Sequence, residues 1–174
     1  MNKFTEKMTL LHSYSLRENN DAVSLQDIEQ FENEIGMKLP NDYIEFVSEF
    51  GLSTFGIDEE EGEEDGCEYV CFLIEPSYRG GSGILDVFLG FAHQGAYNLL
   101  NSYLTYQQRL FPAYIPIAYD PGGNVICMSL NSDNYGSIYF VDHEEMEENR
   151  KSKIYLISNS FTGFINSLYT IIVN

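Results

Sequence analysis

The segment from residue 112 to residue 142 constrains the fold most, because three runs of strand-forming residues alternate there with two turn signals. Proline fixes φ, and glycine and asparagine tolerate positive φ, so each turn can reverse the chain within a few residues. The segment therefore predicts an antiparallel meander. Its strands and turns alternate at 113–119, 120–124, 125–130, 131–136 and 137–141.

The middle strand of this meander is apolar at successive positions, so Ile126 and Cys127 point to opposite faces. A strand that is apolar on both faces is typical of a sheet covered on both sides. We expect other elements to pack against each face. Pro116 has no backbone N–H to donate to a neighbouring strand. This predicts that the first strand lies at an edge of the sheet, or that the side of Pro116 without an N–H faces outward.

Four helices and several further strands are expected around the meander. Apolar side chains recur at helical spacing, Ser or Pro stands at the start of three of the four helices, and Gly ends two of them. Strands are expected at 67–74 and 83–90, which would extend the central sheet, and near 154–157. The predicted helices run from Ser24 to Gly36, from Pro40 to Gly51, from Gly95 to Gln108 and from Ser158 or Ser160 to about Ile172.

The length of 174 residues is that of one domain, and no repeat or linker divides it. We therefore expect residues 1–174 to form a single α+β domain with about four helices on a central, mainly antiparallel sheet. Residues 1–22 are weakly patterned and predict a loosely attached N-terminal arm. Residues 58–66 predict an exposed acidic loop.

The charge is strongly negative, with 27 Asp and Glu against 9 Lys and Arg and a formal net charge of −18. This balance repels phosphate backbones and anionic membranes, so we expect a basic protein partner, no nucleic acid and no membrane. No apolar run reaches the ~18 residues that a membrane span needs, and the first 20 residues lack the apolar segment of a secretory signal. The expected location is the cytoplasm.

Two acidic patches are the candidate partner-binding residues. The first contains seven acids in the eight residues from Asp58 to Asp65, and the second follows Asp142. A run of carboxylates can attract a basic partner over long range, although most such runs are only solvated. The candidate residues are Glu59, Glu60, Glu61, Glu63, Glu64 and Asp65 in the first patch and Glu144, Glu145, Glu147 and Glu148 in the second.

Motifs for catalysis, cofactors and metals fail at specific positions. Ile84 replaces the last glycine of a G-x-S-x-G nucleophile motif around Ser82. A calcium loop starting at Asp58 would place Tyr69 where a bidentate Glu is required. The three cysteines include no C-x-x-C pair, no two histidines form H-x-x-x-H, and no P-loop motif is present. We therefore expect no enzyme activity, no cofactor and no metal.

Four ordered segments resemble conserved elements of the SMI1/KNR4 family, which belongs to the SUKH superfamily. The first segment resembles the pattern LP-x-x-Y-x-x-F…G, and the second resembles P-I-A-x-D-x-x-G-N-x-x-C. The third resembles G-x-V-Y-x-x-D-H-E, and the fourth resembles the S-F-x-x-F-L start of the last helix. They begin at Leu39, Pro116, Gly136 and Ser160.

This resemblance covers roughly residues 24 to 172 and implies an α+β fold with helices on one central sheet. For many bacterial members it implies an immunity protein that binds and neutralises a polymorphic toxin, frequently a nuclease. Other members act as regulatory or scaffold proteins, so a non-enzymatic interaction module of that kind is the alternative. The family tryptophan is absent, and the acidic insertion at Asp58 departs from the family pattern.

Overall fold

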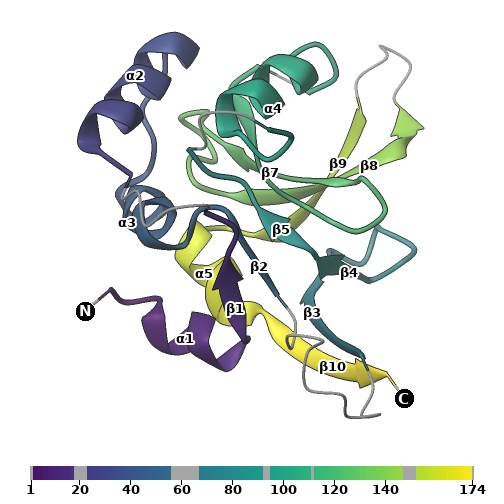
Figure 1. The fold of residues 1–174 in the computed structure, drawn as a ribbon. Coiled ribbons are helices and arrows are strands. Elements are labelled where there is room, and N and C mark those ends of the chain that lie inside the picture. Colours follow the sequence, from purple (N-terminus) through teal and green to yellow (C-terminus); the bar gives the residue numbers. More distant parts are fainter. Residues whose placement is uncertain are drawn as a thin grey trace.

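A seven-stranded sheet forms the centre of the molecule, and the meander supplies its middle (Figure 1). This computed structural model describes residues 2–17, 23–55, 67–91, 95–110, 112–146 and 152–173. The strand order is β1-β2-β5-β6-β7-β8-β9, and every neighbouring pair is antiparallel. The strands are β1 Ser13–Ser15, β2 Ser53–Phe55, β5 Val87–Phe88, β6 Tyr114–Tyr119, β7 Val125–Ser129, β8 Ile138–Met146 and β9 Ser152–Ser158.

The predicted meander is confirmed as β6, β7 and β8, and its turns contain glycine where φ is positive, at Gly123 and Gly136. The expected edge position of Pro116 is wrong, since β6 lies between β5 and β7. A register shift between Pro116 and Ala118 interrupts the pairing with β7. Because a bulge tolerates a residue without an N–H, the proline fits inside the sheet.

A second sheet of three strands lies beside the first, in the order β10-β3-β4. It contains β3 Cys67–Leu73, β4 Ser82–Leu85 and β10 Tyr169–Val173. The expectation that residues 67–74 and 83–90 extend the central sheet is therefore wrong for β3 and β4, and only β5 joins it. The chain passes from one sheet to the other at Asp86, whose N–H donates to the Tyr119 carbonyl over 3.0 Å.

Five helices are present among the described residues, and capping explains most of their starts. Ser24 and Asp27 form a reciprocal capping box, and Gly36 ends that helix with φ 70°, as predicted. Pro40 stands one position before its helix, whereas we expected it inside. The helices are α1 Thr5–Leu10, α2 Leu25–Ile35, α3 Asn41–Phe50, α4 Leu99–Tyr106 and α5 Phe161–Ser167.

The C-terminal helix is shorter than predicted, because α5 ends at Ser167 and the chain continues as β10. Ile172 therefore lies in a strand paired with Glu68, and the expectation that it continues the helical stripe is wrong. The β-branched run Ile171-Ile172-Val173 favours a strand, and pairing with β3 satisfies its backbone.

Both faces of the central sheet are covered, as the middle strand predicted. The larger core contains Ile126 and Met128 together with side chains of α1, α2, α3 and α5. The smaller core contains Val125 and Cys127, packed with residues at and after the end of α4 such as Tyr106 and Leu110. The described residues thus form an α+β domain, and the predicted fold class is confirmed.

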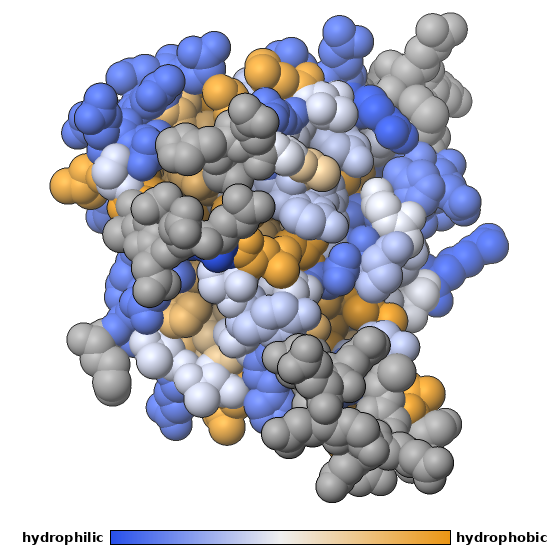
Figure 2. Space-filling view, viewed as in Figure 1, coloured by the Kyte–Doolittle hydropathy of each residue, from blue (hydrophilic) through white to orange (hydrophobic). Residues whose placement is uncertain are grey.

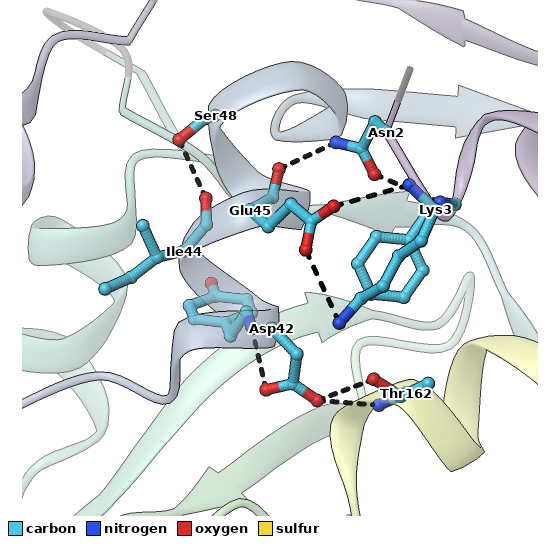
Figure 3. A network of polar contacts seen from close by, with 9 residues as sticks. Asn2, Lys3, Asp42, Ile44, Glu45, Ser48 and Thr162 are labelled. Carbon is cyan, nitrogen blue, oxygen red and sulfur yellow. Dashed lines mark hydrogen bonds and ion pairs between the residues drawn. The ribbon is translucent and has the colours of Figure 1, made fainter.

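Residues 2–17 pack into this domain, so the expected loosely attached arm is wrong for them. Phe4 and Met8 are 1% and 0% exposed in the larger core, and β1 pairs with β2. Asn2 Nδ2 donates to the Glu45 carbonyl over 2.9 Å, and Lys3 Nζ lies 3.4 Å from the Glu45 carboxylate (Figure 3). The i, i+4 spacing of Phe4 and Met8 is a weak signal in a polar stretch. Residues 18–22 lie outside the described residues.

Asp42 connects two helices that carry family motifs. Its Oδ2 accepts hydrogen bonds from the N–H and the Oγ1 of Thr162, over 3.1 and 2.7 Å (Figure 3). Thr162 lies in the first turn of α5, where backbone N–H groups lack partners inside the helix. The carboxylate of α3 therefore caps α5 and fixes the position from which β10 leaves.

Candidate partner-binding surface

The predicted acidic residues are only partly within the described structure. Residues 56–66, which contain the whole first patch, lie between β2 and β3 and outside the described residues. Glu147 and Glu148 also lie outside them. Glu144 and Glu145 are described, on the second half of β8. The structure thus places one pair of the candidate residues and leaves the others as predictions.

Glu145 belongs to a cluster in which carboxylates accept hydrogen bonds from tyrosines. The Tyr155 hydroxyl donates to Glu145 Oε2 over 2.5 Å, and Lys153 Nζ lies 3.2 Å from the same oxygen. The Tyr78 hydroxyl donates to Asp142 Oδ2 over 3.3 Å. The two tyrosine rings lie 5.0 Å apart between centroids. We call Tyr78, Asp142, Glu145 and Tyr155 the tyrosine–carboxylate cluster.

Three chain segments meet in this cluster. Asp142 and Glu145 come from β8, Tyr155 comes from β9, and Tyr78 comes from the connection between β3 and β4. The Tyr78 ring also packs on Phe140 of the larger core, with 5.1 Å between centroids. Because the tyrosine rings pack on the core, their hydroxyl groups hold the two carboxylates in fixed positions at the margin of the central sheet.

The charges of the cluster shift the pKa of its members. The hydrogen bond from Tyr155, followed by that from Lys153, lowers the pKa of Glu145. The hydrogen bond to Glu145, followed by burial, raises the pKa of Tyr155 to about 12. Burial and then Asp142 raise the pKa of Tyr78. These shifts favour the charged form of Glu145 and the neutral, hydrogen-bond-donating form of Tyr155 and Tyr78.

A second polar group explains the family motif at the turn between β6 and β7. Asn124 donates from its backbone and side chain to the Asp120 carboxylate, over 2.6 and 2.7 Å. Its Oδ1 accepts from the backbone N–H of His143 over 3.0 Å and lies 2.8 Å from the imidazole Nδ1. These motif residues hold the turn against β8, so their hydrogen bonds have a structural role.

Asp86 adds a further carboxylate near this turn. Burial, followed by the charge of Asp120, raises the pKa of Asp86. Both effects favour the neutral form of the Asp86 carboxyl.

The described residues contain no candidate metal site, and their cysteines are buried. Within them, no group of three or more His, Cys, Asp and Glu side chains is placed to hold a metal ion. Cys71 and Cys127 are buried free thiols whose pKa is raised by burial, which makes them poor nucleophiles. His12 lies 2.7 Å from Glu68, far along the chain from His143, and His93 lies outside the described residues.

Sequence reasoning missed Tyr78 and Tyr155 in this surface. They are 77 positions apart in the sequence, and neither stands in a run of acidic residues. Only the pairing of β8 with β9 and the approach of the β3–β4 connection bring them beside Glu145. Alternation along β9 would have placed Tyr155 on one face of a strand, but it does not indicate the partner carboxylate.

The comparisons with known proteins agree with the fold and the motifs. The model of the SMI1 / KNR4 family (SUKH-1) matches residues 22–167. The chain belongs to this family. It is also 34% identical, over 150 residues, to the SPbeta prophage-derived uncharacterized protein YokK of Bacillus subtilis (strain 168). That match covers 82% of this chain and 73% of the relative.

Proposed function

We propose that this protein is an immunity protein that neutralises a cognate toxin domain by stoichiometric binding, without catalysis. Membership of the SMI1/KNR4 family and similarity to a prophage-derived protein support a role encoded by mobile genetic loci. The observation that carries the proposal is the anionic cluster fixed at the margin of the central sheet. Charge-assisted hydrogen bonds from Lys or Arg to such carboxylates are among the strongest that proteins form.

The partner in this proposal is a basic domain, such as a nuclease whose cleft holds phosphates. The net charge of −18 would speed its association by long-range attraction. Glu144 and Glu145 would contact it, together with Glu147, Glu148 and the six carboxylates Glu59, Glu60, Glu61, Glu63, Glu64 and Asp65. A nuclease acts on nucleic acid inside cells, so the proposed location of its inhibitor is the cytoplasm. Among the described residues, no helix is long and apolar enough to cross a membrane.

A regulatory or scaffold role without a toxin is the alternative in the same family. Co-expression distinguishes the two. The C-terminal domain encoded directly upstream in the same locus is expressed in bacteria with and without this protein. We expect growth arrest by that domain, relief of the arrest by this protein and co-purification in a 1:1 complex. Arrest that persists, with no complex, would contradict the immunity proposal and favour the regulatory role.

The contribution of the acidic residues is tested by kinetics. Replacing the six carboxylates at 59–65 with Gln or Asn should slow association with the basic domain by about tenfold or more at low salt and flatten the dependence on ionic strength. Glu144→Gln/Glu145→Gln should have a smaller effect of the same kind. The matched control is Glu29→Gln/Glu34→Gln, which removes two exposed charges from α2. If Glu144→Gln/Glu145→Gln and this control associate at the same rate, the tyrosine–carboxylate cluster is excluded as a contact.

A further inference from the structure

The three-stranded sheet buries part of one face in the larger core and exposes apolar side chains on its other face. The register places Val70, Phe72 and Leu85 on one face, and all three are buried in the larger core. Side chains alternate along a strand, so the intervening positions point away from this core. We call this second side the outward face. Its large apolar residues are Tyr69, Leu73, Ile84, Tyr169, Ile171 and Val173.

Several large apolar side chains of the outward face are exposed, although the small side chain of Cys71 at its centre is buried. Leu73 is 64% exposed, Val173 is 53% exposed and Ile171 is 40% exposed. No charged residue occupies this face over the paired register of β10, β3 and β4. An antiparallel sheet with one buried face normally presents polar side chains on the other. A contiguous apolar patch on an otherwise hydrophilic protein marks an interaction site.

Blue, hydrophilic atoms cover much of the surface seen in Figure 2, and orange, hydrophobic atoms appear in several places, one of them at the lower right, where Figure 1 places the C-terminal end of β10.

The net charge disfavours a second copy of this chain as the molecule that covers the outward face. Each copy carries a formal net charge of −18, so bringing two together is opposed by repulsion. A cationic protein gains from the same charge. The β3–β4 connection begins after Leu73 and carries Tyr78 of the tyrosine–carboxylate cluster, so the cluster adjoins the Leu73 end of the outward face. An apolar centre with a charged margin is the usual composition of a protein–protein interface.

We propose that the outward face is the apolar centre of the surface that binds a cationic protein. This inference rests on the proposed function and specifies which described residues make the contact. Carboxylates at the margin would speed the encounter, and burial of Leu73, Ile171 and Val173 would slow dissociation. The ordered backbone of the sheet would lower the entropy lost on binding.

Two neighbouring isoleucines of β10 provide a matched test. Ile171 lies on the outward face, and Ile172 lies on the opposite face and is 68% exposed. Ile171→Glu and Ile172→Glu add the same charge at neighbouring positions, so both should increase long-range attraction to a cationic protein equally. The probe is the purified basic domain that causes growth arrest in the co-expression experiment and whose arrest this protein relieves. We expect Ile171→Glu to raise its Kd by about tenfold or more, and Ile172→Glu by less than about threefold.

Circular dichroism and thermal melting establish that both variants are folded, and Ile171→Ser replaces Ile171→Glu if the latter is not. Equal affinities for the two Glu variants would overturn the inference, while weaker binding by the charge-neutralised variants would leave the proposed function intact. If no basic domain binds the wild type, both the inference and the proposed function are overturned. A wild-type dimer in sedimentation velocity that Ile171→Glu dissociates would show that a second copy covers the face, which also overturns it.

Discussion

Strands β7 and β10 have five residues each and similar apolar content, yet they have opposite surroundings. Every residue of β7 is buried, with cores on both faces. Four of the five residues of β10 are exposed. Both strands are paired, so hydrogen bonding does not explain the difference. The covering of the two faces does, because β7 has a core on each face, whereas most side chains of β10 are exposed to solvent. Strand composition therefore does not indicate which strand forms the core.

The largest expected effect tests this contrast directly. Ile126→Ala in β7 removes a fully buried side chain and should lower the free energy of unfolding by about 2–5 kcal/mol. Ile172→Ala in β10 removes a mostly exposed one and should lower it by less than about 0.5 kcal/mol. Urea denaturation of both variants measures the difference. Similar losses for the two would mean that β10 is buried in solution.

An intermediate effect is expected where β10 is attached to the core. Asp42→Ala removes the carboxylate that accepts from both groups of Thr162, and it should cost about 1–2 kcal/mol of stability. The control is Glu49→Ala, which removes an exposed acid near the other end of α3 and should change stability by less than about 0.5 kcal/mol. Thermal unfolding measures both. If Asp42→Ala matched its control, α5 would not depend on this cap.

The smallest effect is expected at Tyr155, a half-buried residue of β9, which is an edge strand of the central sheet. The pKa of Tyr155 is raised from 10.0 to about 12, so the folded state favours the neutral phenol. Its contribution to stability is therefore present below pH 10 and is lost as pH rises through about 12. The wild type should melt higher than Tyr155→Phe at pH 9, and this advantage should shrink towards pH 12. A constant difference across that range would contradict the hydrogen bond to Glu145.

Local chemistry predicted the parts of the fold that depend on short segments. The capping box at Ser24, the left-handed Gly36 and the meander turns at Gly123 and Gly136 are set by residues within a few positions. Ile172 shows the limit, because its spacing from Phe161 and Leu168 continues a helical stripe by coincidence. Pairing with β3, about 100 positions away, determines its actual structure.

The candidate surface was predictable to a similar extent. Glu144 and Glu145 were identified by charge density, which is a local property of the sequence. Their tyrosine partners were not, because the hydrogen bond from Tyr155 and the ring contact of Tyr78 depend on strand pairing and on the approach of a second sheet. The prediction that Pro116 lies in an edge strand was wrong for the same reason, since the bulge next to it depends on the pairing of β6 with β7.

Leu168 is the one residue between α5 and β10, and it is 1% exposed. Lys7 Nζ donates to its carbonyl over 2.5 Å, so the N-terminal helix also holds this junction. The exposed strand cannot peel away from β3 at this end unless a core side chain is pulled into water. A pulling force applied to β10 would therefore be transmitted to the centre of the domain, and detachment of the strand would be linked to global unfolding.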